Sequence, residues 1–204
     1  MNLYIARHGE TEFNKAGRLQ GNGKDSPLTP KGIAQAQALG ETLKKITKGE
    51  PFDAVYSSNL KRASDTTEIA MGSGYKPILD SRLVEIGLGE MEGMYLQEAA
   101  ETFPEAWGRI ADPVNYIPPP GGEALANMIA RVDSFLADLA KTKHERVFVL
   151  THGYTLRVFQ ACAIDKSVKA LTQTHKYGNC DIAHYKYENG RMALVEVITP
   201  ILPI

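Results

Sequence analysis

Residues 3–14, LYIARHGETEFN, pass from four apolar side chains to a cation, an imidazole and a glycine. The apolar run predicts a short buried strand, which places Arg7 and His8 at its carboxyl end. Burying a charge costs free energy unless a partner compensates for it. Two explanations are open: an ion pair from Arg7 to Glu10 or Glu12 closes the strand, or the strand end binds a ligand.

Apolar runs and helical spacings alternate along the rest of the chain. Further strands are predicted at residues 54–56 and 147–150, and a terminal hairpin at about 181–187 and 192–198 around an Asn-Gly turn. Helices are predicted over about 30–46, 60–71, 125–139 and 155–163, with Ser58 or Asn59 as N-cap of the second. The alternation predicts an α/β fold, a three-layer sandwich whose mostly parallel central sheet is flanked by helices and has an antiparallel edge.

The segment at about 90–122 follows neither pattern. It contains Trp107, Tyr116 and a run of three prolines and two glycines, Pro118–Gly122. We expect a helical insertion and a loop, which cover the active-site end of the sheet like a lid. With 204 residues, the chain is expected to form a single domain over 1–204 that includes this insertion.

The composition excludes several classes of protein. With 43% hydrophobic and 23% charged residues and a net charge of −1, the chain lacks the basic excess of proteins that bind nucleic acid or membrane surfaces. No apolar run approaches the roughly 20 residues of a membrane span, and the N-terminus is unlike a secretory signal. Cys162 and Cys180 have neither metal-ligand spacing nor a disulfide framework, so we expect two reduced core thiols in a cytoplasmic protein.

A second histidine-glycine pair follows the predicted strand at 147–150. His152 and Gly153 stand at its end as His8 and Gly9 stand at the end of the first strand. Ligands of parallel α/β sheets bind beyond the carboxyl ends of the strands. One such histidine is more often a satisfied loop residue than a catalytic one, but two at matching strand ends predict a shared site.

Arg62 and Glu85 are two further candidates. Arg62 falls in the first turns of a predicted helix, where the helix dipole repels a guanidinium unless an anion joins it. Glu85 lies between Val84 and Ile86, and an apolar setting favours the protonated carboxyl group that a general acid needs. Taken singly, Arg62 could equally be a solvated surface residue, and Glu85 a strand-edge residue that faces solvent.

Five stretches, in this order, resemble the histidine phosphatase superfamily in its phosphoglycerate-mutase-like branch. They are RHGETEFN, LQGNGKDSPLTPKG, SSNLKRASDT, LVEIGLGEMEG and THGYTLR, and the resemblance runs from residue 3 to about residue 160. RHGET alone is a moderately specific motif, whereas all five stretches in this order are not expected to occur together by chance.

The resemblance implies a role for each matching residue. His8 matches the phosphorylated nucleophile of the family, the phosphoryl pocket is matched by Arg7, Arg62 and His152, and Glu85 matches the proton donor. The implied substrate side consists of Asn14, Gln20, Gly21, Gly153, whose N–H could approach an oxyanion, and Tyr154, which could gate, stack or pack. Because the arginines supply positive charge, neither a metal nor another cofactor is expected.

The expected partner is a small phosphomonoester, and three functions are open. Hydrolysis through a phosphohistidine is favoured, because LQG stands where mutases of the family usually carry a TGW-like pattern, and EIGLGEMEG is typical of hydrolytic members. The alternative is a cofactor-dependent phosphoglycerate mutase, which transfers the phosphoryl group between hydroxyls. A catalytically inactive phosphate-binding regulator is disfavoured, since such relatives lose the nucleophile or the acid.

Two features bear on the leaving group of the substrate. Ala124 stands where many hydrolytic relatives carry a serine, so a helix cap and a substrate contact are expected to be missing. Four bulky side chains lie in the segment expected to roof the pocket, and packing against the core is favoured for at least two of them: Met91, Met94, Trp107 and Tyr116.

The sequence is compatible with a homo-oligomer and does not define the substrate.

Overall fold

The computed structural model describes residues 1–202 and contains a six-stranded sheet in the order β3-β2-β4-β1-β5-β6. The strands are β1 (Asn2–Arg7), β2 (Ala54–Ser57), β3 (Ile78–Leu79), β4 (Arg146–Thr151), β5 (Ile182–Glu188) and β6 (Arg191–Ile198). The first four are parallel, whereas β5 runs antiparallel to β1, and β6 to β5. The predicted mostly parallel sheet with an antiparallel edge is confirmed. The two-residue edge strand β3 has no counterpart among the predicted strands.

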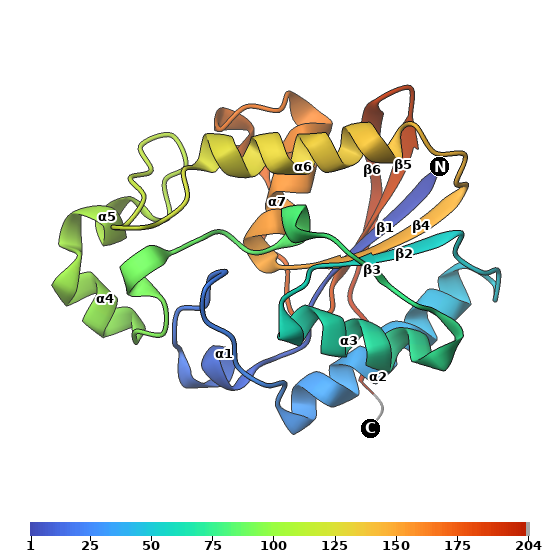
Figure 1. Cartoon of the computed structure of the whole chain (residues 1–204), viewed down its shortest axis with the longest axis horizontal. Helices are drawn as coiled ribbons and strands as arrows, with labels where there is room; N and C mark the ends of the chain where they lie inside the picture. The colour runs from blue at the N-terminus through green and yellow to red at the C-terminus, as the bar shows by residue number, and fades with distance from the viewer. Residues whose placement is uncertain (203–204) are drawn as a thin grey trace.

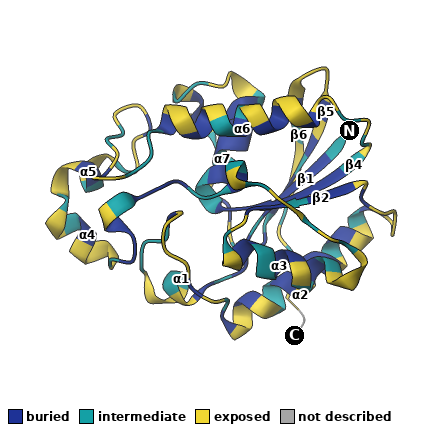
Figure 2. Ribbon diagram, viewed as in Figure 1, coloured by how far each residue is buried: buried dark blue, intermediate teal, exposed yellow. Residues whose placement is uncertain are grey.

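Four long helices cover the sheet in two layers (Figure 1). One face is covered by α2 (Pro30–Ile46) and α3 (Lys61–Met71), and the other by α6 (Leu125–Leu139) and α7 (Gly153–Ile164). Successive side chains of a strand point to opposite faces, so Leu3 and Ile5 pack in the α6–α7 core while Tyr4 and Ala6 pack in the α2–α3 core. The inner strands β1, β2, β4 and β5 and the helix faces turned toward them are largely buried (Figure 2), whereas the edge strands β3 and β6 are mostly exposed. This arrangement confirms the predicted three-layer sandwich.

Two local expectations about the helices are wrong. The helical spacing of apolar residues in 30–46 places Ile33 on one stripe with Ala36 and Leu39, but Ile33 is 41% exposed while the other two are buried against the sheet. Neither Ser58 nor Asn59 is the N-cap of α3. The N-cap is Leu60, without a side-chain hydrogen bond, and the Ser58 hydroxyl accepts the N–H of Leu60.

Short elements gather beyond the carboxyl ends of the parallel strands (Figure 1). They include α1 (Glu12–Ala16), α4 (Leu96–Thr102) and α5 (Pro104–Arg109), of which the last two belong to the predicted insertion. The remaining turns form the short 3-10 helices η1 (Gly72–Gly74), η2 (Ser81–Leu83), η3 (Gly89–Met91) and η4 (Lys169–Gln173). The insertion therefore lies at the end of the sheet where His8 follows β1 and His152 follows β4.

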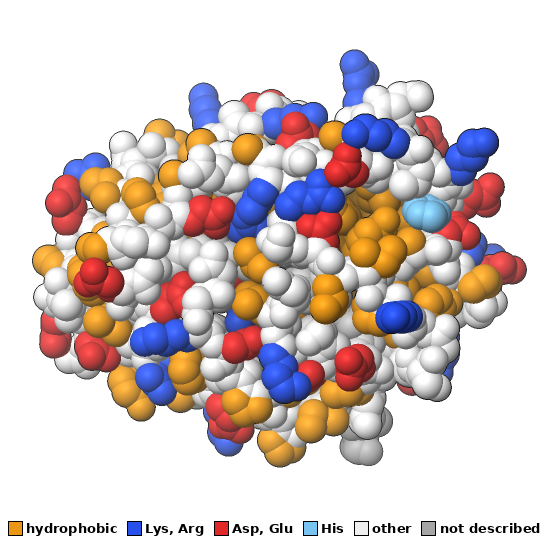
Figure 3. All heavy atoms as spheres, viewed as in Figure 1, with side chains coloured by type: hydrophobic (Ala, Val, Ile, Leu, Met, Phe, Trp, Pro, Cys, Tyr) orange, Lys and Arg blue, Asp and Glu red, His pale blue; other side chains and the backbone are white. Residues whose placement is uncertain are grey.

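The surface and the thiols agree with the composition. Basic and acidic side chains are interspersed on the face drawn in Figure 3. None of the helices within residues 1–202 is long and apolar enough to cross a membrane. Cys162 and Cys180 are buried and unpaired, as predicted, and burial raises the pKa of both thiols to about 12.

Candidate active site

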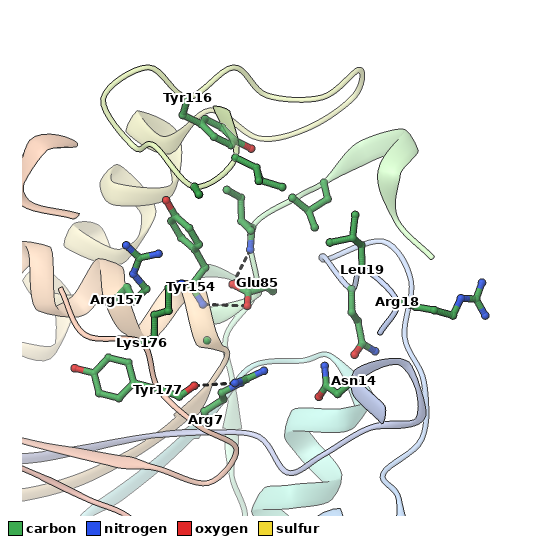
Figure 4. Close-up of a pocket in the computed structure, with 16 residues that line it drawn as sticks. Arg7, Asn14, Arg18, Leu19, Glu85, Tyr116, Tyr154, Arg157, Lys176 and Tyr177 are labelled. Atoms are coloured by element: carbon green, nitrogen blue, oxygen red, sulfur yellow. Dashed lines mark hydrogen bonds between the residues drawn. The ribbon is translucent and has the colours of Figure 1, made fainter. Parts of the chain in front are cut away.

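A pocket of about 490 Å³ opens at the carboxyl end of the sheet. Arg7 enters it from the end of β1, Glu85 from the loop after η2, and Gly153 and Tyr154 from the first turn of α7 (Figure 4). The volume lies within the range of small-molecule sites. The pocket can therefore accept a small organic molecule.

The ring of His8 is buried at the end of β1, and its orientation is fixed from both sides. Nδ1 lies 2.7 Å from the carbonyl oxygen of Gly9, and Nε2 lies 3.3 Å from Nε of Arg62. A carbonyl oxygen only accepts and a guanidinium only donates, so Nδ1 carries the proton and Nε2 the lone pair. Nε2 is therefore the nitrogen that can act as a nucleophile.

The charge state of His8 suits the same role. Burial, and then the positive charges of Arg62 and Arg7, hold the pKa of His8 well below its usual range. The imidazole is therefore neutral at neutral pH. Both guanidinium groups contribute to the lowered pKa, although burial is the larger cause.

The Arg62 guanidinium is buried and paired with Asp25, a residue that the sequence analysis missed. Nη1 of Arg62 lies 2.9 Å from Oδ1 of Asp25, and its Nη2 donates to the carbonyl oxygen of Gly21 at 2.8 Å. An unpaired charge at such depth would be costly, so Asp25 stabilises the arginine. Asp25 lies inside the LQGNGKDSPLTPKG stretch, but nothing local in that stretch indicates a contact 37 residues away.

His152 lies beside His8, with the two ring centroids 5.1 Å apart. Its Nε2 lies 2.8 Å from Oγ of Ser58, and that oxygen already accepts the N–H of Leu60 at 3.3 Å. This arrangement favours a Ser58 hydroxyl that donates to Nε2, which leaves the ring proton on Nδ1. Within residues 1–202, Nδ1 is buried without a hydrogen-bond partner, as expected of a donor that a ligand oxygen would satisfy.

Burial also controls the charge of His152. Together with the positive charges of Arg62 and Arg7, it holds the pKa of His152 well below the usual range. Both histidines of the site are therefore neutral at neutral pH.

Arg7 is not paired with the acidic residues that follow it. Its Nη1 donates to the carbonyl oxygen of Tyr177 at 2.7 Å, and its Nε is buried with no partner in the described part of the chain. Glu10 instead pairs with Lys31 at 2.9 Å, and no ion pair joins Arg7 to Glu12 within residues 1–202. The explanation of the strand end as a local ion pair is therefore wrong.

The carboxylate of Glu85 caps the N-terminus of α7. Oε2 accepts the N–H of Tyr154 at 3.1 Å, and Oε1 accepts the N–H groups of Thr155 at 3.2 Å and Ile86 at 3.0 Å. The expectation of an apolar setting is wrong, because backbone N–H groups donate to both oxygens of the carboxylate. The helix terminus encloses it instead, on the side of the pocket.

A second ion pair positions the loop that carries Glu85. Nε of Arg131 lies 2.8 Å from Oε1 of Glu123, and Arg131 also donates to the carbonyl oxygens of Arg82 and Glu85 at 2.6 and 3.3 Å. The sequence analysis missed this pair. The expected loss of a cap at Ala124 is confirmed, because α6 begins there without a side-chain hydrogen bond.

The predicted substrate-side residues separate into two groups. Four of them line the pocket, namely Asn14, Gln20, Gly153 and Tyr154, whereas Gly21 contributes its carbonyl oxygen to Arg62. A side chain at position 153 would approach Nε of Arg7 to 3.2 Å, so glycine keeps the arginine and the helix close together. In the chain up to residue 202, no group of three or more His, Cys, Asp or Glu side chains could hold a metal ion.

Of the four bulky residues in the insertion, Tyr116 lines the pocket. Met91 is fully buried in the α6–α7 core, and Met94 and Trp107 pack against that core. The expectation that at least two of the four would pack against the core is confirmed.

The chain is similar to known proteins in sequence and in fold. Residues 3–199 match the family model of the histidine phosphatase superfamily, branch 1. A metal-independent phosphoserine phosphatase of Arabidopsis thaliana is 40% identical over 159 residues, which span 76% of this chain and 65% of that protein. Phosphoserine phosphatase 1 of Hydrogenobacter thermophilus is 33% identical over 185 residues, 90% of this chain and 83% of that protein. A solved mycobacterial glucosyl-3-phosphoglycerate phosphatase with VO3 matches with a TM-score of 0.83 at 29% identity and covers 98% of this chain and 99% of its own.

Proposed function

Because the chain belongs to branch 1 of the histidine phosphatase superfamily, we propose that it hydrolyses small phosphomonoesters through a phosphohistidine on Nε2 of His8. The predicted enzyme class, a phosphohydrolase, is confirmed by the family and by the relatives named as phosphatases. The proposed intermediate rests on the neutral ring of His8. Its Nδ1–H donates a hydrogen bond to the carbonyl oxygen of Gly9, and the lone pair of its Nε2 points toward Arg62.

In the first step, Nε2 of His8 attacks phosphorus while the bond from phosphorus to the leaving oxygen breaks. Glu85 acts as the general acid of this step: a proton on its carboxyl group passes to the leaving oxygen, and the carboxylate remains. Arg7 and Arg62 each place a positive charge against the phosphoryl dianion. When the ester binds, the N–H of Arg62 that now bonds to Nε2 turns to a phosphoryl oxygen and frees the lone pair.

His152 supports the same transfer as a hydrogen-bond donor. Its Nδ1, which has no partner in residues 1–202, would donate to a phosphoryl oxygen. A preorganised donor is effective in a buried site because it needs no reorganisation when charge develops. Ser58 acts through His152, since its hydroxyl fixes the ring proton on Nδ1.

In the second step, water attacks the phosphohistidine. The Glu85 carboxylate takes a proton from water as the new bond from oxygen to phosphorus forms. The bond from phosphorus to Nε2 breaks, and its electron pair returns to His8. Inorganic phosphate leaves, and both Glu85 and His8 regain their starting states.

Two other functions were open on the sequence. Relatives named as phosphoglycerate mutases also match, but the named phosphatases make the mutase the less favoured reaction. An inactive regulator is opposed by the presence of all five predicted catalytic groups at one end of the sheet. We further propose a cytoplasmic location, which the two unpaired buried thiols support.

Release of inorganic phosphate tests the proposal. The wild type should release phosphate from p-nitrophenyl phosphate, and His8→Ala should not. With 3-phosphoglycerate, phosphate should form faster than 2-phosphoglycerate. Faster formation of 2-phosphoglycerate than of phosphate would show that the protein is a mutase. If no ester is turned over, the protein would be the inactive phosphate-binding regulator.

A further inference from the structure

The pocket lining carries more positive charge than a phosphoryl group requires. Arg7, Arg18, Arg157 and Lys176 line it, against a single acidic residue, Glu85. The whole chain, in contrast, has a net charge of −1. Arg7 and Arg62, the buried arginine of α3, already match the two negative charges of a phosphomonoester dianion. The other cations are therefore in surplus.

The positive charge of Arg18 does not face the inside of the pocket. Its Nε donates to the carbonyl oxygen of Gly93 at 2.6 Å, and its guanidinium carbon lies 4.3 Å from the ring centroid of Phe13. Figure 4 shows its side chain directed away from the pocket. The surplus charge is therefore that of the two cations on the opposite side.

Arg157 and Lys176 lie on that side together with Tyr154 (Figure 4). The guanidinium carbon of Arg157 lies 4.8 Å from the ring centroid of Tyr154. Its Nε and Nη2 donate to Thr174 and Leu171, both at 2.9 Å, which leaves Nη1 with no partner in residues 1–202. Lys176 is exposed and forms neither an ion pair nor a hydrogen bond with the described residues.

This side of the pocket adjoins the proposed proton donor. The N–H of Tyr154 donates to Oε2 of Glu85 at 3.1 Å. Because the proton donor must contact the leaving oxygen, substituents of the leaving group extend toward Tyr154 and the two cations beside it. The charge surplus therefore faces the leaving group.

Unpaired hydroxyls line the same pocket. The phenol oxygens of Tyr116 and Tyr154 are buried without a hydrogen-bond partner in residues 1–202. A buried hydroxyl without a partner costs free energy, so a ligand atom that accepts from it would bind favourably. Anionic oxygens are strong acceptors for phenols and cations alike.

We propose that the substrate carries a second anionic group on its leaving group, a carboxylate or a second phosphate, which binds Lys176 and Nη1 of Arg157. This inference rests on the proposed hydrolysis and names the class of ester that the site selects. Phosphomonoesters of uncharged alcohols would bind at the phosphoryl end alone.

Matched pairs of esters test this inference. 3-Phosphoglycerate and glycerol 3-phosphate differ in a carboxylate against a CH₂OH group, and fructose 1,6-bisphosphate and fructose 6-phosphate differ in one phosphate. The wild type should favour the more anionic ester of at least one pair by about tenfold or more in kcat/KM. Lys176→Gln should reduce that ratio about tenfold, chiefly through KM. Lys169→Gln, which alters an exposed lysine of η4 outside the pocket, should leave it unchanged.

Ratios near one for both pairs in the wild type would overturn the inference. Equal losses on both esters of a pair in Lys176→Gln would also overturn it, because they would assign the lysine to general attraction of anions. Failure of the proposed function appears separately, as absent turnover of p-nitrophenyl phosphate. In that event calorimetric dissociation constants for the same pairs decide: about tenfold tighter binding of the more anionic ester supports the subsite. Equal binding rejects it.

Discussion

The carboxylate of Asp25 lies 2.9 Å from the guanidinium of Arg62, whose side chain is fully buried while that of Asp25 is 27% exposed. Nε of the same guanidinium lies 3.3 Å from Nε2 of His8. The loop that carries Asp25 is therefore connected to the proposed nucleophile through one arginine. Asp25 is a positioning residue, because it acts on the reacting nitrogen through Arg62.

Replacement of Asp25 should affect both stability and turnover. Asp25→Asn retains an acceptor oxygen but leaves the buried charge of Arg62 without compensation. The free energy of unfolding should fall by about 1–3 kcal/mol in urea titrations. The kcat value should fall by about tenfold, because Arg62 loses its orientation. Asp65→Asn is the control, since Asp65 pairs with the exposed Lys61 and should cost less than about 1 kcal/mol. Equal behaviour of the two variants would contradict the positioning role.

Loss of the proposed proton donor should depend on the leaving group. An alkyl phosphate leaves as a strongly basic alkoxide, so Glu85→Gln should reduce its turnover by roughly 10²–10⁴-fold. p-Nitrophenolate needs no proton, and its release should show a burst followed by a slow phase, because water attack also lacks its base. Glu90→Gln changes an exposed glutamate of η3 and should be near wild type. Equal losses on both esters without a burst would mean that Glu85 is structural.

Stability should fall as the pH decreases below neutrality. Burial is the main cause of the lowered pKa values of His8, His152 and His184 in the folded protein. Below about pH 6.5 the unfolded chain protonates these rings while the folded protein does not, so unfolding takes up protons and stability rises with pH. Each ring contributes at most about 1.4 kcal/mol per pH unit in this window and nothing well above it.

Urea unfolding between about pH 7 and pH 5.5 at constant ionic strength measures this dependence. His8→Asn should reduce the slope, because one of the three contributions is removed. An unchanged slope in that variant would show that the ring of His8 takes up its proton in the folded protein as it does in the unfolded chain.

Removal of divalent metal should leave the phosphatase rate unchanged. Arg7 and Arg62 are proposed to supply the positive charge that a metal ion would otherwise provide. Turnover after treatment with a chelator should equal that of untreated protein, and magnesium should not stimulate it. Vanadate, which mimics five-coordinate phosphorus, should inhibit. A loss of activity that magnesium restores would contradict the assignment of charge to the arginines.

The fold followed largely from local patterns. The helix predicted over residues 125–139 is observed over those residues with its apolar side chains buried, and the Asn-Gly turn joins β5 to β6. The position of a residue at a strand end was enough to bring His8 and His152 within 5.1 Å of each other. These features depend on periodicity and on topology, which the sequence shows directly.

The supporting contacts of the site could not be predicted in this way. Ser58 contacts His152 across 94 positions, and Glu85 reaches the N-terminus of α7 across 69 and 70 positions. These contacts depend on the paths of loops, and loops have no periodicity from which a partner can be inferred. The motif therefore indicated the reacting residues, while the residues that orient them became visible in three dimensions.

Capture of the phosphoryl group on His8 tests the central claim most directly. The protein is mixed with phosphorus-32-labelled p-nitrophenyl phosphate and quenched without acid, since phosphohistidine is labile to acid and stable to alkali. Label should appear in the peptide that contains His8, accumulate further in Glu85→Gln, and persist in the control His144→Ala. It should be absent from His8→Ala. Label that survives in His8→Ala, or its absence from both wild type and Glu85→Gln during turnover, would contradict a phosphohistidine at His8.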